Sequence, residues 1–480
     1  MAVTPAFSRS RAPIADSPLG RINGVLEGGV SVFRGIRYGL ARRFQAPSAP
    51  PLIVGPNVAR TFGPSSPQAG LPDLTKNEDC LFLNIWTPEA NPGARRPVMV
   101  YFHGGAYSSG TAASPLLDGR RLAAAGDVVV VTVQHRLNAF GYLYLARLDP
   151  RFPDSGNAGQ LDLILALRTI RSMIGAFGGD PDRITVFGQS GGGAKIATLM
   201  GTPAAAGLFR NAATMSGQQV TASGPLHATE RTRAYMARLG AAKIDDLLAM
   251  STERLVEGLA ATDPYLGGSV YFGPVLDMKW LVRHPFWPDA NPQGNAVPMM
   301  LGNTHDETRA FYPPEDRRIV SLSWDNLAER MAPELRIDAL PEWVVAEYRR
   351  LFPAYDPAQI FFAATTAGRS WRGQVIEAEE RARAGVPGFV YQLNFPSPAP
   401  HGSDIPLVFG TYADPAWRNV SEAMMAAFLR FARTGDPGWA PYTLPRRETM
   451  IFDTAPHMEN DPRRAERELF ARIPYIQPGT

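Results

Sequence analysis

The sequence contains a single cysteine, Cys80, among its 480 residues, so an intramolecular disulfide is impossible. It has no run of about 20 apolar residues, which is the length that a membrane-spanning helix requires. Residues 1–20 lack the apolar centre of a secretory signal. These three absences favour a soluble cytoplasmic protein without a membrane span, and that is the location we expect.

An excess of charge of one sign is also missing. The 48 Lys and Arg residues nearly balance 45 Asp and Glu residues, which leaves a formal net charge of +3. That excess is too small to indicate nucleic acid as a partner. The chain has no H-E-x-x-H zinc motif, no G-x-G-x-x-G fingerprint and no complete phosphate loop, because Ile196 follows Lys195 where Ser or Thr would hold magnesium. We therefore expect no metal and no cofactor.

Apolar residues make up 45% of the chain and charged residues 19%, which is ordinary for a globular protein with a large core. Short apolar runs at 97–102, 127–133 and 183–187 are separated by stretches that include an amphipathic segment at 161–174. Continuous apolar strands that alternate with helices are typical of a mostly parallel sheet covered on both faces. The sequence therefore predicts an α/β fold.

Strand-like segments return late in the chain, after long middle regions of helical character. We expect one domain over residues 1–480, with helical insertions at about 220–295 and 315–385. The segment at about 20–38 alternates between apolar and polar residues and contains glycines, which predicts an N-terminal β-hairpin.

The sharpest local motif is Gly-Gln-Ser-Gly-Gly at 188–192, which follows the third apolar run and precedes a plausible helix. A serine on a tight strand-to-helix turn has a strained backbone, needs small neighbours and presents its hydroxyl above the sheet. The helix N-terminus also favours negative charge beside it. A glycine-serine loop without chemistry is the alternative, but this placement favours Ser190 as the nucleophile of an α/β-hydrolase.

A second glycine motif, His-Gly-Gly-Ala at 103–106, directly follows the predicted strand at 97–102. Loops of this type supply backbone N–H groups to the oxyanion of a tetrahedral intermediate. Each such donor contributes on the order of 10²–10³ in rate. The residue after the nucleophile, Gly191, should supply another donor. A simple turn is the alternative, but two glycine motifs together indicate an oxyanion hole.

In an α/β-hydrolase the acid and then the histidine follow the serine along the chain. The histidines that leave room for an acid after Ser190 are His284, His305, His401 and His457. We favour His401, which follows the predicted strand at 388–393, because catalytic residues gather at the carboxyl ends of strands. His457 ranks second. Both Asp306 and Glu307 follow another predicted strand, and their spacing does not separate them as the acid.

With these motifs the chain resembles the type-B carboxylesterase and cholinesterase family, in its bacterial para-nitrobenzyl esterase-like branch. The matching segments lie at 77–86, 103–106, 177–181, 188–192, 215–217, 306–307 and 408–410. They extend over nearly the whole chain, and the segment at 77–86 is highly specific.

The resemblance implies a carboxylic ester hydrolase that forms an acyl-enzyme on a small-molecule ester, without cofactor or metal. It implies Ser190 as nucleophile, Glu307 as acid and His401 as general base. It also implies Gly105, Ala106 and Gly191 as oxyanion donors, and Gln189 and Ser216 in supporting positions.

Two departures from the family pattern bear on the substrate. Gln189 stands where many relatives have glutamate, which removes an acidic group and disfavours cationic choline esters. Cys80 matches a cysteine that secreted relatives place in a disulfide, but here it has no partner. We therefore expect an intracellular serine carboxylesterase for uncharged esters.

Two alternatives stay open: a specialised esterase, lactonase or amidase with the same triad, and a non-catalytic binding relative of the fold. The second is disfavoured, because such relatives have typically lost the serine. The sequence leaves both a monomer and a homodimer open. Aromatic candidates for an apolar pocket wall are Phe272, Trp280, Phe286, Trp287, Phe311, Tyr312 and Trp371.

Overall fold

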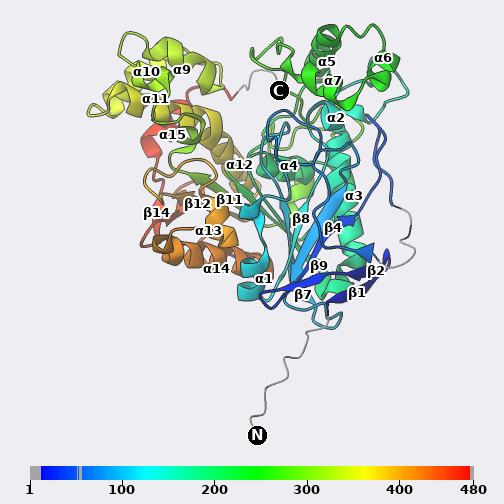
Figure 1. The fold of residues 1–480 in the computed structure, drawn as a ribbon. Helices are drawn as coiled ribbons and strands as arrows, with labels where there is room; N and C mark the ends of the chain where they lie inside the picture. The colour runs from blue at the N-terminus through cyan, green and yellow to red at the C-terminus, as the bar shows by residue number, and fades with distance from the viewer. Residues whose placement is uncertain (1–11, 51, 53–56, 476–480) are drawn as a thin grey trace.

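The computed structural model describes residues 12–50, 52 and 57–475. Its centre is an 11-stranded sheet with strand order β14-β13-β12-β11-β10-β9-β7-β8-β6-β4-β3 (Figure 1). The strands are β3 (Val25–Glu27), β4 (Val30–Arg37), β6 (Phe82–Thr87), β7 (Arg96–Phe102), β8 (Val129–Val133), β9 (Gly179–Gln189), β10 (Asn211–Met215), β11 (Met299–Thr304), β12 (Gly388–Leu393), β13 (Glu448–Phe452) and β14 (His457–Asn460). Neighbours from β8 to β13 run parallel, whereas those at both edges run antiparallel.

Alternate residues of each central strand enter different cores, because successive side chains point to opposite faces of a sheet. In β7, Val98 and Val100 pack with apolar residues of α3 (Ala158–Met173) and α4 (Gly191–Met200). Met99 and Tyr101 pack on the other face with α1 (Arg120–Gly126) and α14 (Arg418–Thr434). Both faces are therefore covered by helices, and the predicted α/β fold class is confirmed.

The predicted N-terminal hairpin, at about 20–38, contributes to two sheets. β3 and β4 pair antiparallel across Gly28 and Gly29, whose φ angles of 56° and 82° suit a two-residue hairpin turn. The residues before them form β2 (Gly20–Asn23), which pairs with β1 (Ile14–Ser17) and β5 (Asn57–Val58) in a small separate sheet.

The first predicted insertion is helical only in its first half. It contains α5 (Pro225–Leu239), α6 (Ile244–Ala249) and α7 (Thr252–Glu257). From 261 to 291 the chain forms turns and isolated bridges instead of the expected helix. Proline is frequent in that stretch, where it removes backbone donors and clashes with a preceding helical turn, so it explains the difference.

The second predicted insertion is helical almost throughout. Its helices are α8 (Arg317–Val320), α9 (Leu327–Leu335), α10 (Pro341–Leu351), α11 (Pro357–Thr366) and α12 (Arg372–Arg383), with a π-helical turn at Ala367–Trp371 between the last two. Figure 1 shows α5–α7 and α9–α11 at the same end of the molecule, on opposite sides of the view. In the described ranges, no helix is long and apolar enough to cross a bilayer.

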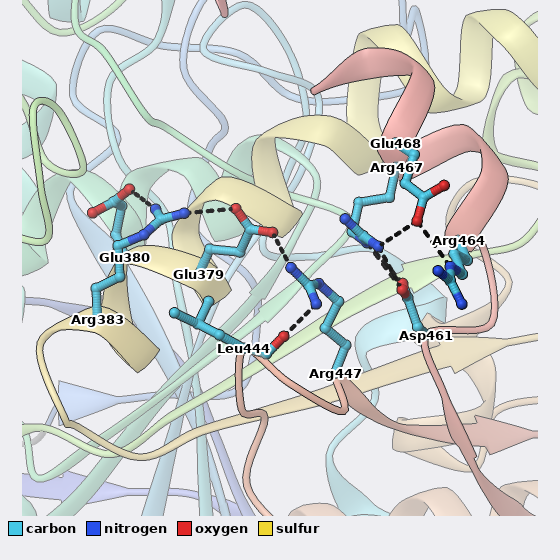
Figure 2. Close-up of polar contacts among 9 residues, drawn as sticks. All are labelled: Glu379, Glu380, Arg383, Leu444, Arg447, Asp461, Arg464, Arg467 and Glu468. Carbon is cyan, nitrogen blue, oxygen red and sulfur yellow. Dashed lines mark hydrogen bonds and ion pairs between the residues drawn. The ribbon is translucent and has the colours of Figure 1, made fainter. Parts of the chain in front are cut away.

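A network of ion pairs in two groups lies at the β13–β14 edge, as Figure 2 shows. One group joins α12 to the residue before β13, and the other joins Asp461, just after β14, to α15 (Arg464–Phe470). Arg447 before β13 lies 3.5 Å from a carboxylate oxygen of Glu379, which also lies 3.1 Å from Arg383. Arg467 pairs with Asp461 at 2.7 Å. The network consists of Glu379, Glu380, Arg383, Arg447, Asp461, Arg464, Arg467 and Glu468.

Candidate active site

Ser190 lies on the sharp turn between β9 and α4, with φ 57° and ψ −126°. Its N–H donates to the carbonyl of Met215 at 2.7 Å, which fixes the turn to the neighbouring strand. A β-carbon at Gly188 would lie 2.7 Å from the backbone of Gly192, and one at Gly192 would lie 1.9 Å from the Phe102 carbonyl. Only glycine fits at these two positions, so the motif at 188–192 has a steric cause.

Glu307 lies just after β11, and its carboxylate is buried against His401. Oε2 of Glu307 is in short hydrogen-bond contact with Nδ1 of the His401 ring. Oε1 accepts from the Thr304 N–H at 2.8 Å and from the Asn303 side chain at 3.0 Å. Burial works to raise the pKa of Glu307, but the charge and hydrogen bond of His401 outweigh it and lower the pKa. The carboxylate therefore stays ionised and holds a proton on Nδ1.

The other candidates for acid and base lie elsewhere. Asp306 accepts from the Ala399 N–H at 3.0 Å and contacts the His305 ring at 3.1 Å. Of the two carboxylates that spacing leaves open, Glu307 is therefore the one that contacts His401. His457 lies on the exposed edge strand β14, where its ring contacts Glu459 at 3.0 Å.

The second ring nitrogen of His401 faces Gln189. Nε2 of His401 lies 3.0 Å from the side-chain nitrogen of Gln189, which is buried beside the elbow. Because Nδ1 carries the proton, Nε2 has a free lone pair and accepts from this amide. Within the described residues, no hydrogen bond of 3.5 Å or less joins Ser190 Oγ to this ring. Ser190 and His401 line one cavity, and catalytic hydrogen bonds often tighten only when substrate binds.

The predicted oxyanion loop lies against the elbow with two residues in the left-handed region, Gly105 at φ 86° and Ala106 at φ 52°. In the part of the chain that the structure describes, their N–H groups have no protein acceptor. Gly191 begins α4, where an N–H has no partner within the helix. A β-carbon at Gly191 would lie 2.0 Å from the Ala106 carbonyl oxygen, so the loop and the elbow are in direct contact.

Lys195 holds the oxyanion loop from behind. Its Nζ, fully buried on α4, donates to the carbonyl of Ala106 at 2.7 Å and to that of His103 at 3.2 Å. Burial lowers the pKa of Lys195 to about 7. Sequence reasoning considered this lysine only as part of a phosphate loop. The available signal was a charged residue on a helix otherwise built from small and apolar residues.

Ser190, His401 and Glu307 open onto a cavity of about 400 Å³. Of the predicted oxyanion and supporting residues, Ala106, Gly191 and Ser216 line it, whereas Gly105 and Gln189 are not part of the lining. Ser216 donates its N–H to the Gly302 carbonyl at 2.6 Å, and its hydroxyl lies beside Glu307 without a well-formed hydrogen bond.

The aromatic candidates for the pocket wall are dispersed. Phe311 lines the cavity, and its ring lies tilted against the His401 ring with 5.3 Å between centroids. Phe272, Phe286 and Tyr312 belong to the apolar cores, and Trp371 lines a different, small cavity. The wall instead contains Leu266 and Tyr271 from the first insertion and Arg336 and Arg369 from the second, none of which the sequence indicated. The described residues contain no group of three His, Cys, Asp or Glu side chains placed to hold a metal ion.

Known proteins match this chain over nearly its full length. Residues 11–470 match the model of the carboxylesterase family. Para-nitrobenzyl esterase of Bacillus subtilis (strain 168) is 31% identical over 492 residues, covering 95% of this chain and 98% of that protein. Carboxylesterase 3B of Mus musculus is 31% identical over 487 residues, covering 88% and 83%.

The same likeness holds in three dimensions. A crystal structure of a carboxylesterase from Geobacillus stearothermophilus aligns with a TM-score of 0.86 at 33% identity, covering 95% of this chain and 99% of that chain. The predicted resemblance and the α/β-hydrolase fold are thus confirmed. By sequence, by fold and by the extent of the match, the chain belongs to the carboxylesterase family and is a serine carboxylesterase that acts on carboxylic esters.

Proposed function

We propose that Ser190, His401 and Glu307 are the nucleophile, general base and acid of this esterase. The observation that carries the proposal is the contact of the buried Glu307 carboxylate with Nδ1 of His401, in the cavity that Ser190 lines. An ionised carboxylate fixes the imidazole tautomer whose Nε2 accepts a proton, and it stabilises the cation that forms.

In the acylation step, Nε2 of His401 takes the hydroxyl proton as Ser190 Oγ bonds to the ester carbonyl carbon. The side chain of Gln189 must turn away from Nε2 as this happens, since an amide N–H repels a protonated ring. The imidazolium then gives its proton to the departing alkoxide, and the C–O bond of the ester breaks. Water, deprotonated by the same nitrogen, releases the acid from Ser190.

The backbone N–H groups of Gly105, Ala106 and Gly191 hold the oxyanion in this proposal. Two observations support this assignment. The oxyanion loop is in close contact with the elbow at Gly191, and the described residues offer no acceptor to the N–H groups of Gly105 and Ala106. Preorganised donors need no reorientation when charge develops, and each contributes on the order of 10²–10³ in rate. Lys195 keeps the loop in place through the Ala106 carbonyl and is a positioning residue. Gln189 and Ser216 support His401 and Glu307 respectively.

We further propose that residues 1–480 form one catalytic domain, with the regions at about 220–295 and 315–385 as insertions over the active site. We also propose that the enzyme acts in the cytoplasm on small-molecule esters and binds no nucleic acid. The buried free thiol of Cys80 and the small net charge support these assignments. Cell fractionation followed by immunoblotting tests the location, and recovery in a secreted fraction contradicts it.

Covalent labelling tests the nucleophile. A fluorophosphonate should add one phosphonyl group to the enzyme, and peptide mass spectrometry should place it on Ser190. Ser190→Ala should abolish labelling and reduce turnover of short 4-nitrophenyl esters by about 10⁶-fold, as for other serine triads. Ser172→Ala, at an exposed position in the last turn of α3 and outside the cavity lining, serves as the matched control. A phosphonyl group on another serine, or turnover retained by Ser190→Ala, contradicts the assignment.

A further inference from the structure

The wall of the catalytic cavity carries more positive than negative charge. Its side chains that are charged at neutral pH are Arg336, Arg369 and Glu307, and Glu307 is already engaged by His401. Two guanidinium groups therefore face a space of about 400 Å³ without a free carboxylate in the lining. Like charges that line one cavity attract an ion of opposite sign.

Arg336 is the less satisfied of the two. It caps the C-terminal end of α9 in the left-handed conformation, at φ 57°, and it is half-buried. Within the described residues, no carboxylate oxygen lies within 4.0 Å of its guanidinium, and it makes no side-chain hydrogen bond. The hydrogen-bonding capacity of its guanidinium is therefore left for a ligand in the cavity.

Arg369 lies on the π-helical turn between α11 and α12, and its guanidinium stacks over the Phe311 ring at 4.4 Å. It pairs with Glu334 at 3.1 Å, and Arg336 does not share that carboxylate. Burial, and next the charge of Arg336, lower the pKa of Arg369. Both residues line one cavity, where their like charges repel, and a bound anion would relieve that repulsion.

The first insertion contributes a hydroxyl on the same wall. Burial raises the pKa of Tyr271 to about 12, while the charges of Arg231 and Arg336 act in the opposite direction. Tyr271 thus lies within electrostatic range of Arg336 and lines the same cavity. The protonated phenol of Tyr271 can donate a hydrogen bond from the same cavity wall as the charged guanidinium of Arg336.

We propose that Arg336 and Arg369, with Tyr271, form a subsite for a carboxylate, so that esters bearing a free carboxylate remote from the scissile bond are the preferred substrates. The planar guanidinium binds a carboxylate through two parallel hydrogen bonds, which suits this ligand better than a point charge would. The inference rests on the proposed function of Ser190, because the carboxylate is bound while that serine attacks the ester group. Either the acyl or the alcohol part can carry the carboxylate.

Matched ester pairs test the subsite. On the acyl side we compare the mono-4-nitrophenyl ester of adipic acid with the ester in which the free carboxylate is a carboxamide. On the alcohol side we compare 6-acetoxyhexanoate with 6-acetoxyhexanamide. We expect kcat/KM to be on the order of 10-fold higher for the carboxylate in at least one pair. The advantage should appear in KM, since a remote anchor binds substrate and transition state alike, and it should shrink with added salt.

Arg336→Gln should remove most of that preference while hydrolysis of the carboxamide ester continues. Arg330→Gln is the matched control, because Arg330 lies exposed on the same helix and outside the cavity lining. Arg369→Lys keeps the charge facing Glu334 but loses the planar fork, so it should weaken the preference without unfolding the second insertion.

The outcomes separate this inference from the proposed function. If the wild type hydrolyses the carboxamide and carboxylate esters equally in both pairs, the subsite is wrong while the esterase assignment stands. The subsite is equally contradicted if Arg336→Gln retains the full preference. If no ester of either kind is turned over, the catalytic assignment itself fails.

Discussion

Within the described residues, each arginine of the network in Figure 2 lies within 3.5 Å of a carboxylate oxygen, whereas Lys195 and Arg336 at the catalytic cavity have no carboxylate partner. The network is partly exposed; one of its groups ties α12 to the start of β13, and the other ties the end of β14 to α15. Ion pairs of that kind each contribute about 0–1 kcal/mol to the free energy of unfolding. At the cavity, by contrast, Lys195 contacts backbone carbonyls and Arg336 has no partner among the described residues.

The difference shows what each region is built for. Paired charges cancel, so they fix geometry without attracting anything further. Unpaired charges in a poorly solvated space keep their field, and such groups cluster where a ligand or a transition state supplies the missing partner. Substitutions in the network should therefore change stability and leave chemistry alone, while substitutions at the cavity should do the reverse.

After Ser190→Ala, the largest effect is expected from Glu307→Gln, which removes the charge behind His401. The amide can stabilise the tautomer of His401 whose proton is on Nε2, and that nitrogen then cannot accept the serine proton. We therefore expect kcat to fall by about 10⁴-fold. The midpoint of urea unfolding should change little, because the amide keeps the shape of the carboxylate. Steady-state kinetics and circular dichroism check the two statements, and a loss smaller than tenfold would show that another group holds the imidazole.

Lys195→Met should lower kcat by about 10²–10³-fold, the contribution of one misplaced oxyanion donor. The thioether fills the space but leaves the carbonyl of Ala106 without its donor, so the loop loses its anchor. A transition-state analogue such as a boronic acid should lose the same factor in affinity. Lys279→Met, at an exposed lysine away from the cavity, is the control. Unchanged kcat in the Lys195 variant contradicts the positioning role.

Helix α12 carries glutamates of both kinds: Glu377, which is buried without an ion pair to any described residue, and Glu379, which belongs to the network. Glu377 is fully buried and accepts from the Gln219 N–H at 2.8 Å, and burial raises its pKa from 4.5 to about 8. Between pH 4.5 and about 8 the unfolded chain gives up this proton while the folded protein keeps it. The free energy of unfolding should therefore fall as pH rises through that window. In Glu377→Gln the fall should be smaller by a few kcal/mol, as measured by urea titrations at pH 5 and pH 8.

Glu379 lies one half-turn further along α12 and belongs to the network. Because each ion pair of the network contributes little to stability, its substitution should have the smallest effect of those considered. Glu379→Gln removes the partner of Arg383 and Arg447 and should lower the free energy of unfolding by about 1 kcal/mol. The kcat and KM values should match those of the wild type. A loss of activity in this variant would contradict the claim that the network affects stability and not catalysis.

The sequence predicted those parts of the site that depend on local stereochemistry. Gly188 and Gly192 flank Ser190 because no β-carbon fits at either position. This steric requirement produces a short glycine motif that can be recognised in the sequence. Spacing did not separate Asp306 from Glu307, since both follow the same strand and only the path of the loop at 399–401 decides which one meets His401. Resemblance to a family supplied that choice.

Contacts between distant segments were not predictable in the same way. Lys195 binds the carbonyls of His103 and Ala106, which lie about 90 positions earlier in the chain. A local sequence pattern around a lysine does not indicate which distant carbonyl will accept from it. Arg336 and Arg369 reach the cavity only because the second insertion folds back over the sheet. The stretch from 261 to 291 was expected to be helical, but its prolines act against a helix that composition alone suggested.

The contact between Gly191 and the Ala106 carbonyl restricts which residue can follow the nucleophile in this enzyme. An alanine at 191, as in the Gly-Glu-Ser-Ala elbow typical of many relatives, would place its methyl group 2.0 Å from an oxygen that Lys195 holds in position. A protein engineer who grafts that elbow alone should therefore displace the oxyanion loop from its contact with Lys195.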